Sequence, residues 1–125
     1  MLAAVNAERA AAGVAPLSRC GTLDVAAEGH SADQAAHNNL SHTGSNGSTP
    51  PQRMTAAGYT GFNGWAENAA AGFRTVASVM NGWMGSQGHR NNILRSNMEH
   101  LGMGLAYSAN GTPYWTQVFG RGGTC

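Results

Sequence analysis

Two stretches of the chain carry apolar and weakly polar residues at helical spacing. In residues 21–40 the stripe consists of Leu23, Ala26, Ala27, His30, Gln34, His37 and Leu40. In residues 75–84 it consists of Val76, Val79, Met80 and Trp83. A period of 3.6 predicts helices that bury one face. We expect Thr22 and Thr75 to be their N-caps, because a hydroxyl oxygen can accept a hydrogen bond from a free N–H of the first turn.

Three shorter helical segments are also predicted. Ala, Glu and Arg favour a helix at the start of the chain, which Gly13 and Pro16 end. Pro51 suits the first turn of a short helix that runs through Met54 to Ala57. The run HRNNIL at residues 89–94 allows one further helical turn.

Strand patterns occupy the remaining structured segments. A Gly-punctuated stretch leads into a short extended segment at residues 65–70. Near the C-terminus Leu101, Met103, Leu105 and Tyr107 alternate with small residues, as expected for one face of a strand. Asn110 and Gly111 form a strong turn signal, after which residues 112–120 return as a second strand. Helices beside a small antiparallel sheet predict a layered α+β fold, and residues 1–125 are expected to form a single domain without repeat or linker.

Composition excludes several classes of function. Charged residues make up 10% of the 125 residues, and the net charge of +1 comes without a basic run, so no nucleic-acid partner is expected. No apolar run approaches the ~20 residues that span a bilayer. We expect a monomer without a transmembrane segment. No signal peptide is visible, so the chain resembles a mature or trimmed domain with an added start residue.

Cys20 and Cys125 are the only cysteines. A cysteine at the last residue is a poor buried hydrophobe, because chain ends fray. A disulfide between the two explains this position better than two free thiols do. The bond would imply an oxidising compartment, so we expect the protein to be secreted or extracytoplasmic.

The five histidines offer the clearest candidate chemistry. None belongs to the H-E-x-x-H pattern of zinc proteases. His30 and His37 lie on one predicted helix face, where packing plus a hydrogen bond is the simpler interpretation. His100 is the first residue of a predicted strand and is expected to be exposed. His42 and His89 lie instead at loop edges beside small residues, where an imidazole can be approached. Taken alone, each is better interpreted as a hydrogen-bonding loop residue than as a ligand-binding one.

Ser86 lies three residues before His89, a spacing that suggests a nucleophile and its base. The hydrolase elbow G-x-S-x-G is absent, because Met84 stands where the first glycine is needed. A capping or turn serine is the favoured interpretation.

Taken together, these segments resemble the CAP superfamily, which comprises cysteine-rich secretory, antigen five and pathogenesis-related class 1 proteins. The matching segments are VNAERAAAGVAPL, SHTG, GYTGFNGWAENAAAG, WMGSQGHRNNIL and GMGLAYSANGTPYWTQVFG, in the order typical of the compact bacterial branch. The resemblance covers nearly the whole chain. It implies a three-layer α-β-α sandwich with a central cleft.

The resemblance also implies a cleft site of two histidines and two acidic residues. The histidines are His42 and His89, and the first glutamate is Glu67. The second glutamate falls at Ser86, which leaves one carboxylate in the cleft. Ala66 also replaces the glycine of the family's G-E-N motif. Metal bound by the two histidines is known in the family, so Zn²⁺ or another divalent metal is expected at His42 and His89.

Three functional hypotheses follow. The favoured one is a secreted, non-enzymatic binding module with a His/Glu cleft that can bind a divalent metal such as zinc. The second is a metal-assisted hydrolase or protease, although no nucleophile, oxyanion motif or complete metal triad is legible. The third is a cell-envelope interaction domain with a purely structural cleft. Small-molecule, lipid and cell-envelope ligands all stay open.

Overall fold

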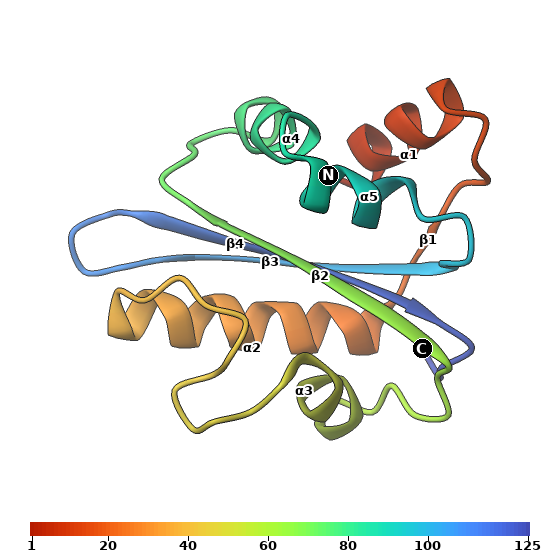
Figure 1. The fold of residues 1–125 in the computed structure, drawn as a ribbon. Helices are drawn as coiled ribbons and strands as arrows, with labels where there is room; N and C mark the ends of the chain where they lie inside the picture. The colour runs from red at the N-terminus through yellow and green to blue at the C-terminus, as the bar shows by residue number, and fades with distance from the viewer.

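The computed structural model describes all of residues 1–125 as three layers, with a sheet between two layers of helices (Figure 1). One face of the sheet is covered by α2 (Gly21–His37) and α3 (Pro50–Ala56). The opposite face is covered by α1 (Leu2–Ala11), α4 (Val76–Met84) and α5 (Gln87–Leu94). The α+β sandwich predicted from the sequence is therefore confirmed. None of the helices has the length and apolar character that a membrane span requires.

The sheet is mixed, and this corrects the expected antiparallel sheet. Its strand order is β1-β3-β4-β2, with β1 (Ser18–Arg19), β2 (Gly64–Ala71), β3 (His100–Tyr107) and β4 (Pro113–Arg121). Strands β3, β4 and β2 are antiparallel neighbours as predicted, whereas β1 runs parallel to β3. Two residues are too few to produce an alternating pattern, so β1 could not be predicted.

Helix α2 differs from its prediction at both ends. Its N-cap is Cys20, and the hydroxyl of Thr22 instead donates to the Thr124 carbonyl oxygen at 2.8 Å. At the other end Asn38 adopts a left-handed conformation with φ 47°, which stops the helix at His37. His37 and Leu40 are consequently exposed, although the helical stripe predicted that they would be buried. In α4 the predicted N-cap Thr75 is confirmed, because its side chain accepts from the Ser78 backbone N–H.

Close contact between α2 and β3 depends on two glycines. A Cβ atom on Gly102 would overlap the backbone of Leu23, and one on Gly104 would overlap the backbone at Ala27. The face of β3 that carries Gly102 and Gly104 therefore lies directly against α2, and the side chain of Leu101 points away from this helix. Only glycine permits this approach, which brings α2 close enough to the sheet for its side chains to reach neighbouring strands.

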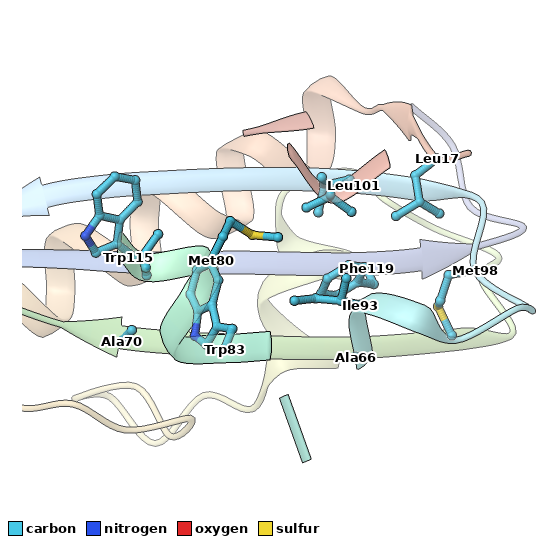
Figure 2. Packing of buried hydrophobic residues seen from close by; sticks show 12 residues of the cluster. Leu17, Ala66, Ala70, Met80, Trp83, Ile93, Met98, Leu101, Trp115 and Phe119 are labelled. Carbon is cyan, nitrogen blue, oxygen red and sulfur yellow. The ribbon is translucent and has the colours of Figure 1, made fainter. Parts of the chain in front are cut away.

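The larger hydrophobic core fills the space between the sheet and α1, α4 and α5 (Figure 2). Its largest members are Trp83, Phe119, Trp115, Met80, Ile93 and Leu101. A smaller cluster on the α2 and α3 side contains Cys20, Leu23, Ala27, Met54, Tyr59 and Val118. Ala66 and Ala70 of β2 point into the larger core, so the intervening Glu67 faces the α2 and α3 side.

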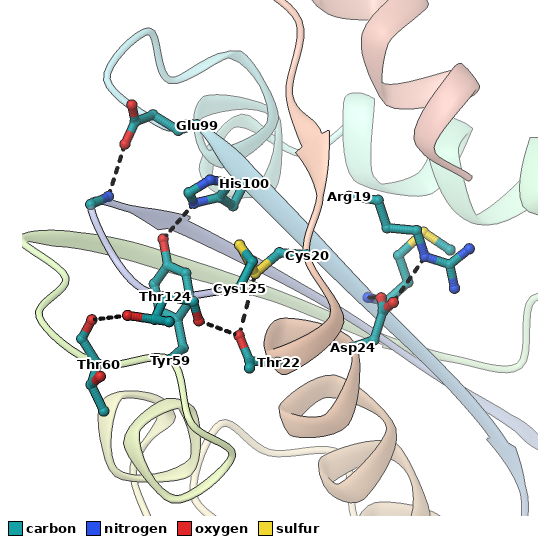
Figure 3. The surroundings of a disulfide bond; sticks show 12 residues. Arg19, Cys20, Thr22, Asp24, Tyr59, Thr60, Glu99, His100, Thr124 and Cys125 are labelled. Atoms are coloured by element: carbon teal, nitrogen blue, oxygen red, sulfur yellow. Dashed lines mark hydrogen bonds and ion pairs between the residues drawn. A yellow bond between two sulfur atoms is a disulfide. The ribbon is translucent and has the colours of Figure 1, made fainter.

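The predicted disulfide between Cys20 and Cys125 is formed, with the two Cα atoms 5.1 Å apart. Figure 3 shows how it fastens the end of the chain to the start of α2. Nearby, the Tyr59 hydroxyl and the His100 Nδ1 atom are 2.8 Å apart. His100 is therefore half-buried and hydrogen-bonded, whereas the sequence predicted an exposed side chain.

Candidate functional site

The candidate site is organised around the buried carboxylate of Glu67 on the edge strand β2. The Glu67 side chain is 1% exposed. Its Oε1 atom lies 2.9 Å from Nδ1 of His42, and its Oε2 atom accepts a hydrogen bond from Nη2 of Arg53 at 2.9 Å. A buried carboxylate needs such partners, because leaving it unpaired would cost several kcal/mol.

Arg53 joins three segments of the chain through one guanidinium group. It lies on α3, whose N-terminus is fixed by a capping box between Thr49 and Gln52. Besides Glu67, Arg53 donates to the carbonyl oxygens of Ser48 at 2.7 Å and His42 at 2.8 Å. The same charge that neutralises Glu67 therefore also holds the loop that carries His42.

His30 of α2 lies behind this pair and has no exposed side-chain surface. Its Nε2 atom is 2.6 Å from the Ser41 carbonyl oxygen and 3.7 Å from Glu67 Oε1. A carbonyl can only accept, so Nε2 carries the proton, and the buried Nδ1 atom has no partner. Burial lowers the pKa of His30, which favours the neutral ring. The packing and hydrogen bond predicted for His30 are both present.

His42 is the exposed member of the site, with 59% of its side chain accessible. The hydrogen bond to Glu67 raises the pKa of His42, and the nearby charge of the carboxylate acts in the same direction. Burial and the positive charge of Arg53 oppose this shift but are smaller than the hydrogen bond. The pair thus favours an imidazolium at His42 over a wider pH range than in free histidine.

His89 is positioned from the opposite side of β2. Asn68, the neighbour of Glu67, is fully buried and donates to the His89 carbonyl oxygen at 3.1 Å. Asn92 of the same helix donates to Asn68 Oδ1 at 2.8 Å, so Asn68 anchors α5 to the strand. The His89 Nδ1 atom lies 2.9 Å from the Ser86 hydroxyl oxygen. Burial lowers the pKa of His89, and the charge of His42 lowers it further.

A cleft of about 560 Å³ runs over this part of β2. Its walls are formed by His42, Pro50, Trp65, Ala66, Glu67, Asn92 and Arg95. Of the residues predicted from the sequence, His42 and Glu67 lie in this cleft. Ser86 and His89 are not among its lining residues, and their helix reaches the cleft through Asn92 and Arg95 instead.

A metal bound by His42 and His89 would have these two protein ligands alone. Each histidine uses Nδ1 for an orienting contact, His42 with Glu67 and His89 with Ser86, and this leaves Nε2 of each ring without a protein partner. Metal-binding histidines are commonly oriented in this way. The structure contains no group of three or more His, Cys, Asp or Glu side chains that could hold a metal. Solvent or a ligand would therefore have to supply the other coordination positions.

Sequence reasoning missed Arg53, and it did not connect His30 or Asn68 with the site. The requirement that a buried glutamate has a cationic partner was available as a signal. This requirement could not identify which of the seven arginines is the partner, because Arg53 and Glu67 are 14 positions apart in different elements.

Similarity to known proteins covers most of the chain. It is 36% identical over 114 residues to the uncharacterized protein YkwD of Bacillus subtilis, covering 91% of this chain and 43% of that protein. It is 32% identical over 91 residues to the uncharacterized membrane protein YlbC of the same organism, covering 73% of this chain and 25% of YlbC. The chain thus spans less than half the length of these two relatives.

Two solved structures share the fold. An outer surface protein from Borrelia burgdorferi superposes with a TM-score of 0.88 at 21% identity, covering 96% of this chain and 88% of that chain. An extracellular protein containing an SCP domain from Bacillus anthracis has a TM-score of 0.84 at 29% identity, covering 94% of this chain and 38% of that one. The model of the CAP family, described as the cysteine-rich secretory protein family, matches residues 2–119. The chain therefore belongs to the CAP, or cysteine-rich secretory protein, family.

Proposed function

We propose that this chain is an extracytoplasmic, non-enzymatic binding module in which the cleft beside β2 takes the ligand. The observation that carries the proposal is the His42–Glu67 pair, in which a buried and neutralised carboxylate fixes an exposed imidazole at 2.9 Å. A rigid polar group at the wall of an open cleft is typical of sites that orient a ligand.

We further propose that His42 and His89 bind a divalent metal such as Zn²⁺. The free Nε2 atom of each ring and the orienting contact at each Nδ1 support this assignment. Two protein ligands give modest affinity, and because both imidazoles must be neutral to bind metal, affinity should rise with pH.

A hydrolase is less well supported than a binding module. Arg53 and His42 occupy the two oxygens of Glu67, so this carboxylate is poorly suited to act as a general base. Ser86 and His89 are in contact at 2.9 Å, but no acidic side chain orients His89 in the way that a catalytic triad requires. Ser86 occupies the N-cap position of α5, but its hydroxyl makes no capping hydrogen bond and contacts His89 Nδ1 instead.

An extracytoplasmic location is supported by the disulfide between Cys20 and Cys125, since such bonds persist in oxidising compartments. Two proteins with the same fold are described as an outer surface protein and an extracellular protein. A role at the cell envelope, with the cleft as a structural feature, is the alternative that remains if no ligand binds.

The test is a calorimetric titration of Zn²⁺ into the wild type, the His42→Ala/His89→Ala variant and His37→Ala. His37 is an exposed histidine outside the cleft and serves as the matched control. Saturable heat in the wild type and in His37→Ala, absent from the double variant, is expected. Equal heats from all three proteins would reject the metal assignment.

A further inference from the structure

Trp65 differs from the other two tryptophans in being exposed within the cleft. Its exposed fraction is 41%, against 2% for Trp83 and 7% for Trp115. The indoles of Trp83 and Trp115 donate to the carbonyl oxygens of Ala69 and Phe73, whereas Trp65 makes no hydrogen bond through its ring. Part of an aromatic side chain, with no hydrogen bond from its indole, is thus exposed at the cleft wall.

Arg95 supplies an unneutralised positive charge to the same cleft. Its side chain makes a single hydrogen bond, from Nη2 to Asn92 Oδ1 at 3.3 Å, and no ion pair. In contrast, Arg53 and Arg19 are already paired with carboxylates, those of Glu67 and Asp24 respectively. The Arg95 backbone is held in place, because its carbonyl oxygen accepts from the buried Arg9 at 2.9 Å. A guanidinium on a fixed backbone favours a carboxylate ligand, which it can bind through two parallel N–H bonds.

The edge of β2 offers little to an extended peptide. The Gly72 N–H donates to the Pro113 carbonyl oxygen, so Gly72 faces β4. Because residues of an antiparallel strand alternate in this respect, the backbone N–H and C=O groups of Trp65, Glu67 and Ala69 point away from β4. Asn92 already donates to the Glu67 carbonyl oxygen at 3.3 Å, and Trp83 to that of Ala69 at 3.2 Å. Side chains of the protein thus already use two of the outward carbonyl oxygens, which disfavours main-chain pairing along the strand and favours recognition of a ligand by side chains.

The cleft lining suits a hydroxyl-rich ring better than a peptide side chain. Pro50, Ala66 and Trp65 are its apolar members, while the exposed side chains of His42 and Arg95 supply polar groups, and Glu67 and Asn92 complete the lining. A pyranose ring has C–H groups on one face, which can lie on the negative face of an indole, and hydroxyls at its rim for the polar walls.

We infer that the cleft binds a carboxylate-bearing sugar, with the ring on Trp65 and the carboxylate on Arg95. The inference rests on the proposed function, since it names the ligand class of the same cleft. A uronic acid and a sugar with a carboxylated substituent, such as muramic acid, share this chemistry. Neither requires the metal, so binding should occur in metal-free protein.

The experiment uses EDTA-treated protein and follows binding by tryptophan emission and calorimetry. The probes are trigalacturonate, its methyl ester, the N-acetylglucosaminyl–N-acetylmuramic acid disaccharide and tetraglutamate. At least one carboxylated sugar should bind, and the two free acids distinguish the sources of the carboxylate. If trigalacturonate binds, its methyl ester should bind about tenfold more weakly, because the ester removes a charged hydrogen-bond partner. This comparison needs no variant and does not depend on a substitution being tolerated.

Arg95→Gln should weaken binding of the acidic sugar about tenfold, and Trp65→Ala should weaken it and abolish the emission change. Arg90→Gln, at an exposed arginine of α5 that does not line the cleft, should leave affinity unchanged. Binding of neither acid, equal binding of trigalacturonate and its ester, wild-type affinity in Arg95→Gln, or tighter binding of tetraglutamate would each overturn the inference. If zinc still binds at His42 and His89 in that case, the proposed function stands and only the ligand class is wrong.

Discussion

His42 and Glu67 form a hydrogen-bonded pair in which one member is in solvent and the other is not. The Nδ1 to Oε1 distance is 2.9 Å, and the side chains are 59% and 1% exposed. The carboxylate cannot move away, because Arg53 bonds its second oxygen at 2.9 Å. The protonation of an exposed imidazole is consequently governed by a charge that water screens poorly.

The first prediction concerns the titration of His42. Its pKa should lie above the ordinary value of 6.5, because the hydrogen bond to Glu67 favours the imidazolium. A raised pKa in the folded state means that the pair contributes its full stability below about pH 6.5 and loses it as pH rises through the folded pKa. Histidine ring signals followed by NMR against pH would measure this, with His89 expected to titrate below 6.5 in the same spectra.

Glu67→Gln provides the comparison for that measurement. The amide keeps the shape of the side chain but removes the negative charge, so the pKa of His42 should fall toward its ordinary value. An unchanged pKa in Glu67→Gln, or a wild-type value at or below about 6.5, would show that the pair does not control His42.

The second prediction concerns Arg53. Replacing it with glutamine removes the guanidinium partner of the buried Glu67 and frees the Ser48 and His42 carbonyl oxygens. Breaking a buried ion pair by removing one partner costs about 3 kcal/mol of unfolding free energy or more. Urea unfolding of Arg53→Gln would measure this loss. Arg121→Gln, at an exposed arginine with one long bond to Asn97, should cost less than about 0.5 kcal/mol. Equal stabilities for the two variants would contradict the role assigned to Arg53.

Local periodicity and turn chemistry account for the parts of the fold that could be predicted. The apolar stripe of α4, the Asn110–Gly111 turn and the α+β layers all follow from them. The end of α2 could not be predicted, because the stripe continues through His37 and Leu40 while the backbone turns at Asn38. The contribution of a single left-handed residue to helix termination is not visible in a hydrophobic pattern.

The residues of the candidate site also include some that the sequence identified and some that it could not identify. His42 and Glu67 were identified through motifs that resemble the CAP family, and they are in contact. Arg53 belongs to the same charge cluster only because α3 packs beside β2, and that packing is a tertiary property. The cleft wall formed by Trp65 and Arg95 likewise brings together a strand and the end of a helix. Contacts between elements of this kind leave no spacing rule in the sequence.

The third prediction tests the close approach of α2 to β3. Gly102→Ala should lower the unfolding free energy by about 3 kcal/mol or more, because the new methyl group meets the Leu23 backbone and no flexible side chain can yield. Gly29→Ala is the matched control, since it lies in α2 with open space around its Cα. That substitution should raise stability by about 0.5–1 kcal/mol through helix propensity. Thermal or urea unfolding of both variants would measure these changes in unfolding free energy. A Gly102→Ala protein as stable as the wild type would contradict the close packing of β3 against α2.

The fourth prediction concerns the disulfide. Cys125 is exposed, so Cys125→Ala removes the cross-link with little loss of packing, and the unfolding free energy should fall by about 2–4 kcal/mol. The bond joins residues 105 apart, which places the entropic loss toward the upper part of that range. Cys20→Ala should cost more, because Cys20 is fully buried in the core cluster with Leu23 and Met54.

Reductant should destabilise the wild type by the same amount as Cys125→Ala and should not affect that variant. A wild type that is insensitive to reductant, once mass spectrometry shows both thiols free, would mean that the C-terminus is held by its other contacts, such as the hydrogen bond from Thr22 to Thr124.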